Sequence, residues 1–140
     1  MSAARTLFVA FLLSALLPSG SLSAQTCPQP TAIDCDQSLT GATGSGLNHI
    51  TMYPCWDYAF DGEEAVYLLT LEHDTLVEIP LYPIWPFDAG LIVMPALDGD
   101  CYPSTVLGCS DSGGRGEREG LGGVLTAGSY FIVVDGYNGS

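Results

Sequence analysis

Residues 129–135, near the end of the chain, contain an uninterrupted run of apolar and β-branched residues at 130–134. Such a run is typical of a strand that is buried on both faces of a sheet. Residues 65–71 have the same character, and residues 90–94 supply a shorter apolar run. Apolar residues occupy every second position of residues 75–81. This alternation predicts a strand with one buried face.

The segments between these runs predict how the strands are connected. Residues 72–74 are expected to form the turn of a hairpin between 65–71 and 75–81, and residues 127–128 to reverse the chain between a short strand at 124–126 and the strand at 129–135. Weaker strand-like pieces lie at 38–40 and 48–53, and a long polar loop covers 110–120. No helical period appears after residue 24. The fold class is therefore expected to be all-β, an antiparallel β-sandwich with 65–71 and 129–135 as interior strands.

The first 24 residues have the pattern of a secretory signal peptide rather than of a folded element. Arg5 is the only charge before an apolar run over 7–17, and small residues at 22–24 precede Gln25. The run is short for a membrane span, and the alternative is a buried helix of the fold. We expect residues 1–24 to be a signal peptide, and the protein to be secreted. Residues 25–140 are expected to form one domain with no membrane span.

Charge is strongly one-sided in this chain. The formal net charge is −13, there is no lysine, and only Arg115 and Arg118 are basic after residue 24. Such a surface repels nucleic acid and anionic lipid, so neither is expected as a partner. The excess of acidic residues indicates either solubility in a saline extracellular medium or calcium binding.

Five cysteines lie beyond the signal peptide, where an oxidising exterior favours disulfides. Short loops favour the pairs Cys35–Cys55 and Cys101–Cys109, which leaves Cys27 over. Zinc is a weaker alternative, because the chain has no Cys-x-x-Cys and its two histidines stand apart from the cysteines.

Acidic residues in the expected loops form the candidate metal site. Calcium sites in β-sandwiches use such carboxylates with backbone carbonyls, although no EF-hand spacing is present. The alternative is that these acids only face solvent. The candidate ligands are Asp61, Glu63, Asp98, Asp100 and Asp135.

Aromatic residues in two loops are the candidate ligand contacts: Trp56, Tyr58 and Trp85. Exposed rings can stack on sugars, and the alternative is that they cover one end of the core. No catalytic constellation is present. Residues 111–114, Asp-Ser-Gly-Gly, resemble the nucleophile segment of chymotrypsin-like serine proteases, but the matching histidine signature is missing.

Three motifs together resemble the bacterial pre-peptidase C-terminal domain. They are Gly-Glu-Glu-Ala-Val-Tyr at 62–67, the Cys101 to Cys109-Ser-Asp segment, and Leu-Thr-Ala-Gly-Ser-Tyr-Phe-Ile-Val-Val-Asp-Gly-Tyr at 125–137. The resemblance implies a jelly-roll-like sandwich and a non-catalytic accessory or binding module, in some members calcium-bound or attached to an extracellular protein or polysaccharide.

The family usually continues past the Asp-Gly-Tyr turn with a closing strand and a cysteine. Here Ser140 ends the sequence, so we expect a sandwich that lacks its last strand, with the partner of Cys27 further on. The alternative function is the N-terminal part of a secreted hydrolase whose catalytic region lies beyond residue 140.

Overall fold

The computed structural model describes residues 29–43, 48–97, 101 and 105–137, and no α-helix occurs among them. None of the described segments is a helix long and apolar enough to cross a membrane. The strands are β1 (Thr31–Ile33), β2 (Ala65–Leu71), β3 (Thr75–Leu81), β4 (Ala89–Pro95), β5 (Gly108–Ser110), β6 (Glu119–Leu125) and β7 (Gly128–Gly136).

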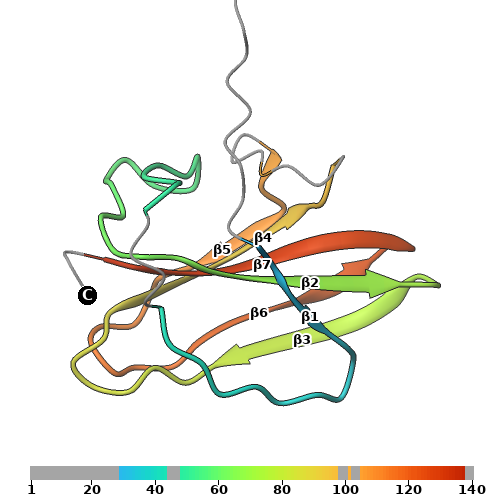
Figure 1. Cartoon of the computed structure of the whole chain (residues 1–140), viewed down its shortest axis with the longest axis horizontal. Helices are drawn as coiled ribbons and strands as arrows, with labels where there is room; N and C mark the ends of the chain where they lie inside the picture. Colours follow the sequence, from blue (N-terminus) through green and yellow to red (C-terminus); the bar gives the residue numbers. More distant parts are fainter. Residues whose placement is uncertain (1–28, 44–47, 98–100, 102–104, 138–140) are drawn as a thin grey trace, which may run out of the picture.

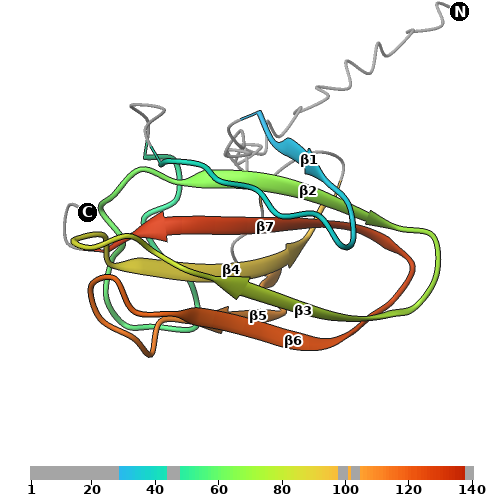
Figure 2. The same cartoon turned by 90° about the horizontal axis from the view of Figure 1, so that it is seen from below.

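Two sheets pack against each other, which confirms the all-β sandwich (Figures 1 and 2). The larger sheet has the order β1-β2-β7-β4-β5, and the smaller one pairs β3 with β6. All pairs are antiparallel except β1 with β2, which is parallel. As expected, β2 and β7 are interior strands of the larger sheet.

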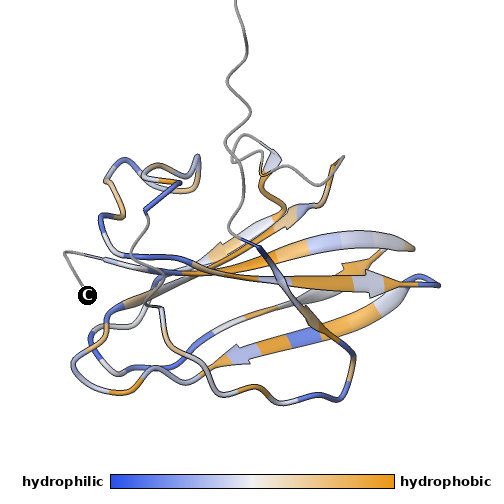
Figure 3. Ribbon diagram, viewed as in Figure 1, coloured by the Kyte–Doolittle hydropathy of each residue, from blue (hydrophilic) through white to orange (hydrophobic). Residues whose placement is uncertain are grey.

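The expected hairpins are wrong, because each short connection leads from one sheet to the other. β2 pairs with β1 and β7, whereas β3 pairs with β6. The hydrophilic turn at 72–74 therefore crosses between the layers, at the right-hand end of Figure 3. The turn at 126–127 does the same between β6 and β7. Both chain reversals bring strands face to face instead of edge to edge.

β7 is buried on both faces because a different layer covers each one. Tyr130, Ile132 and Val134 face β3 and β6, where inward side chains of both strands meet them. Phe131 and Val133 point to the opposite face, as the two-residue period of a strand requires. Among the described residues, no second sheet covers this opposite face.

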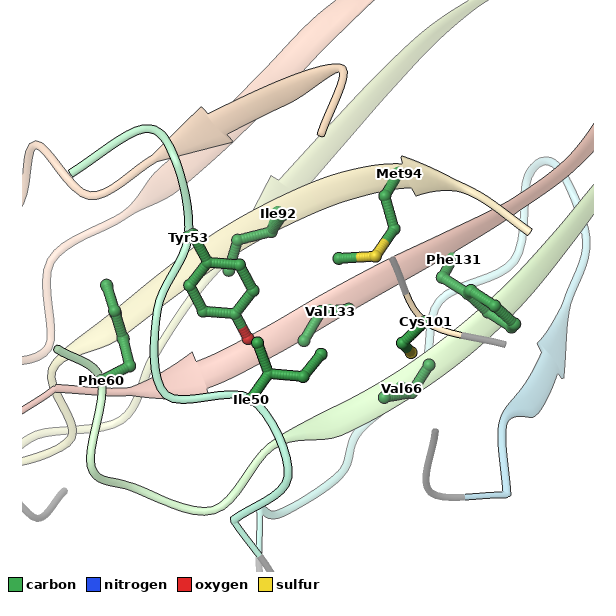
Figure 4. Packing of buried hydrophobic residues seen from close by; sticks show 9 residues of the cluster. All are labelled: Ile50, Tyr53, Phe60, Val66, Ile92, Met94, Cys101, Phe131 and Val133. Carbon is green, nitrogen blue, oxygen red and sulfur yellow. The ribbon is translucent and has the colours of Figure 1, made fainter. Parts of the chain in front are cut away.

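An irregular stretch, residues 48–62, covers that face, and we call it the cap (Figure 1). Tyr53 and Phe60 of the cap are fully buried against β4 and β7 (Figure 4). Phe60 lies directly over Gly90 of β4, where a Cβ atom would come within 2.5 Å of the ring. The absence of a side chain at Gly90 therefore allows the cap to pack closely against the sheet.

Several weaker expectations differ from the structure. Residues 38–40 and 48–53 are irregular, not strands. β6 begins at Glu119, inside the expected polar loop, and continues to Leu125 rather than being confined to 124–126. β1 was not expected at all, since its three residues are too few to give a pattern.

Candidate functional site

Asp135, one of the candidate calcium ligands, is fully buried beneath the cap. Strand alternation places it on the same face of β7 as Val133. The hydroxyl of Tyr53 donates a 2.6 Å hydrogen bond to its Oδ2, while Oδ1 has no hydrogen-bond partner. Burial raises the pKa of Asp135 to about 7; the hydrogen bond from Tyr53 and the backbone of Gly136 oppose the rise, and the negative charge of Glu64 adds to it. The same burial, together with Asp135, raises the pKa of Tyr53.

A second buried carboxylate, Glu64, holds the start of the cap. Its oxygens accept hydrogen bonds from the backbone N–H of His49 at 2.8 and 3.1 Å, and its Oε1 lies 2.9 Å from Nδ1 of the same histidine. Because both carboxylate oxygens accept hydrogen bonds from the His49 backbone, Glu64 anchors the start of the cap.

The disulfides differ from the expected pairs. Cys55 of the cap is bonded to Cys109 of β5, 54 positions away. Cys35 is a free, exposed thiol, and Cys101 is disulfide-bonded but not to Cys109. The pairs Cys35–Cys55 and Cys101–Cys109 are therefore wrong, because proximity along the chain does not determine proximity in a sandwich. Cys27 lies outside the described residues.

Two of the three candidate ligand contacts pack inside the cap. Trp56 stacks on Tyr58 with ring centroids 6.0 Å apart and lies 4.9 Å from the ring of Phe60. The hydroxyl of Tyr58 donates a 2.6 Å hydrogen bond to Asp111, and burial with this bond raises the pKa of the tyrosine. These rings are therefore part of the core, and the hydrogen bond from Tyr58 to Asp111 links the cap to the loop between β5 and β6.

The candidate calcium ligands are only partly brought together. Asp61 is exposed and close enough to Asp135 to raise its pKa, Glu63 is half-buried, and Asp98 and Asp100 lie outside the described residues. Within the described part of the chain, no three histidine, cysteine or acidic side chains form a metal-binding group.

Sequence reasoning missed two of the three buried acids among the described residues, Glu64 and, at the start of β6, Glu119. The carboxylate of Glu119 accepts hydrogen bonds from the Ser110 hydroxyl and from the backbone N–H groups of Ser112, at 3.2 Å, and Gly113, at 2.6 Å. A Cβ at Gly113 would meet Glu119 Oε1 at 2.7 Å. The protease-like segment 111–114 is thus a backbone cradle for this carboxylate, and its small residues were the signal that could have indicated it.

The third candidate contact, Trp85, is on the surface. The β3–β4 loop, residues 82–88, exposes three large side chains: Tyr82 at 69%, Ile84 at 80% and Trp85 at 72%. Monomeric proteins rarely expose large contiguous apolar patches. This loop is the most concentrated exposed apolar surface of the described chain.

The β5–β6 loop, residues 111–118, braces this surface at the same end of the sandwich (Figure 1). The backbone N–H of Gly116 donates a 2.8 Å hydrogen bond to the carbonyl of Phe87, and the N–H of Phe87 donates one of 3.0 Å to the carbonyl of Ile84. Gly116 has a φ of +74°, and a Cβ there would lie 3.1 Å from Cβ of Trp85. The exposed side chains therefore stand on a fixed backbone.

A guanidinium completes the arrangement. Cζ of Arg118 lies 5.6 Å from the centroid of the Tyr82 ring, a cation–π contact. Arg115 is exposed in the same loop. We call Tyr82, Ile84, Trp85, Arg115 and Arg118 the loop-pair surface.

Comparisons with protein-family models, with curated proteins and with solved structures gave no match. The likeness to the pre-peptidase C-terminal domain therefore rests on the three sequence motifs, and the loop-pair surface is assigned from its own geometry.

Proposed function

We propose that this chain is a secreted, non-catalytic binding module that attaches to an extracellular protein or polysaccharide through the loop-pair surface. One observation carries the proposal: Tyr82, Ile84 and Trp85 are each at least 69% exposed on a loop whose backbone is fixed by hydrogen bonds. Exposed apolar patches of this kind mark interaction sites. A fixed backbone reduces the entropy lost when such a surface binds.

The family resemblance and the disulfide support the same proposal. The family contains accessory modules of exported proteins, and a disulfide between Cys55 and Cys109 suits an oxidising compartment.

A retention assay tests the proposal. The chain is incubated with insoluble polysaccharides and insoluble extracellular proteins, and the depletion of protein from solution is measured. We expect wild type to be retained on at least one material and a variant with Ile84→Ser and Trp85→Ala to lose most of that retention. The matched control is Leu76→Ser with Val124→Ser, which removes two equally exposed apolar side chains, 73% and 68%, from the opposite end of the smaller sheet.

Retention of the loop variant at the wild-type level would contradict the proposal, as would absence of retention on every material. Peptide and glycoside hydrolysis are measured on the same samples. Hydrolysis by the chain itself would overturn the non-catalytic assignment.

A further inference from the structure

β6 forms one edge of the smaller sheet, and part of its backbone has no partner. It pairs with β3 alone, in a regular register that sets Gly120 opposite Pro80. Proline has no N–H to donate, and the N–H of Gly120 instead donates a 3.3 Å hydrogen bond to the Ser110 hydroxyl. The backbone groups of Gly120, Gly122 and Val124 therefore point away from β3. Within the described residues, no hydrogen bond reaches Gly122 or Val124 from that side.

The other sheet edges carry features that oppose the addition of a further strand. β1 and β5, at the edges of the larger sheet, are three residues long each. The free edge of β3 contains Pro80 and the charged Glu78. β6 has neither protection, because residues 120–128 contain no charge and no proline and Gly122 and Val124 are exposed. Along the lower border of Figure 2, β6 is the one edge of the described sandwich that is open to another strand.

The side chains of β6 are also incompletely covered. Leu121 and Leu125 face the larger sheet but are only half-buried, whereas most residues of β4 and β7 are buried. On the outer face, Val124 lies opposite Leu76, and these side chains are 68% and 73% exposed. A strand added at this edge would contact side chains on both faces, and such cross-strand contacts stabilise sheets.

From these observations we infer that a second copy of this chain binds here, with the two β6 strands paired antiparallel. Setting Gly122 of one copy opposite Val124 of the other lets all the unpartnered N–H groups of these residues donate across the junction. The two-fold axis then lies at Gly123, and Leu121 of each copy lies opposite Leu125 of the other. The two-stranded sheets of the copies become one continuous sheet. This self-complementary contact is of the closed type that makes dimers.

Net charge opposes this association, because each copy carries −13. Acids flank the pairing segment at Asp74, Glu78 and Glu119, but none lies within residues 120–128, so no two acids are directly opposite in the pair. The remaining repulsion acts over a distance and is screened beyond about 8 Å at physiological salt. The dimer should therefore tighten as salt is added, whereas an interface made of ion pairs would weaken.

Sedimentation equilibrium of the full chain, at several protein and salt concentrations, tests the inference. We expect a monomer–dimer equilibrium that tightens between about 0.05 M and about 0.5 M salt. Val124→Glu puts a charge at the paired edge and should weaken the dimer at least about tenfold. The matched control, Leu76→Glu, adds the same charge to the same face but one strand further from the junction. It should weaken the dimer much less.

Amide hydrogen exchange followed by NMR locates the contact. The amides of Gly122 and Val124 should exchange several-fold more slowly in concentrated than in dilute samples, whereas the amide of Gly123, which faces β3, should not change. A chain that stays monomeric, equal weakening by Val124→Glu and Leu76→Glu, or unchanged exchange at Gly122 and Val124 overturns the inference.

Two controls separate this test from other effects. Equal unfolding temperatures of the variants in dilute samples exclude loss of folding as the cause of a weaker dimer. The inference does not use the loop-pair surface, so the depletion assay is run at concentrations where the chain is monomeric. Failure of the dimer then leaves the proposed function standing, and failure of retention leaves the dimer standing.

Discussion

Tyr53 of the cap and Asp135 of β7 lie 82 positions apart in sequence, and the tyrosine hydroxyl donates a 2.6 Å hydrogen bond to the buried carboxylate. This bond joins the irregular cap to the central strand of the larger sheet. Because one oxygen of Asp135 lacks a hydrogen-bond partner, the ionised form is poorly solvated. The stability of the capped sandwich should therefore depend on pH.

The first prediction is that the fold loses stability as pH rises through 7. Burial raises the pKa of Asp135 from 3.8 to about 7, so the folded state binds a proton that the unfolded state has released. The stabilisation is complete below about pH 4 and is lost as pH rises through the folded pKa. The free energy of unfolding in urea should fall between pH 5 and pH 8.

Asp135→Asn is the matched variant for this prediction, because its amide has the same shape and does not titrate. Its stability should change less between pH 5 and pH 8 than that of wild type. Burial also raises the pKa of Asp111, so a smaller slope should remain. A variant with the full wild-type slope would show that another group causes the effect.

The second prediction concerns the close approach of Gly90 and Phe60. Gly90→Ala should destabilise the fold by about 1–3 kcal/mol, because the added methyl group would come within 2.5 Å of the ring and force repacking. A smaller residue at 60 should reduce this cost. In the double variant with Phe60→Leu, the two losses measured by urea unfolding should therefore not add. Additive losses would show that the two positions do not interact.

The third prediction tests the disulfide between the cap and β5. Peptide mapping without reduction should link Cys55 to Cys109 and find Cys35 alkylated by iodoacetamide. Replacing Cys55 and Cys109 by alanine should cost about 2–4 kcal/mol of unfolding free energy. A Cys35–Cys55 peptide would contradict this connectivity.

The fourth prediction concerns calcium, which stays a prediction because Asp98 and Asp100 lie outside the described residues. If loop carboxylates bind calcium in the folded state only, millimolar calcium should raise the melting temperature by several degrees. A calcium concentration a hundredfold above Kd stabilises the folded state by about 2.7 kcal/mol. Magnesium and sodium at equal ionic strength should act weakly. Equal shifts with all three salts would mean that the acids are only screened.

The strands were largely predictable, and their partners were not. β2 and β3 have the expected bounds, and β7 extends the expected strand by one residue at each end, since continuous apolar runs and apolar alternation both report burial directly. The same pattern does not say whether a short connection turns within a sheet or crosses between sheets. β6 was mostly missed because glycines at 120, 122 and 123 remove the side chains that indicate a strand.

The candidate site was predictable only in part for a related reason. Trp85 was identified as an aromatic residue in a loop, but sequence alone gave Trp56 the same description. Only the packing distinguishes the half-buried ring from the exposed one. The pairing of Arg118 with Tyr82 joins two loops 36 positions apart, and no local pattern indicates it.

Oxidative footprinting tests the loop-pair surface most directly. Hydroxyl-radical labelling of the intact chain is compared with and without the material that retains it in the depletion assay. Tyr82 and Trp85 should be labelled several-fold more slowly when ligand is bound, while Met52, half exposed on the cap, should be labelled at an unchanged rate. Protection of Met52 with continued labelling of Trp85 would contradict the assignment of the loop pair as the binding surface.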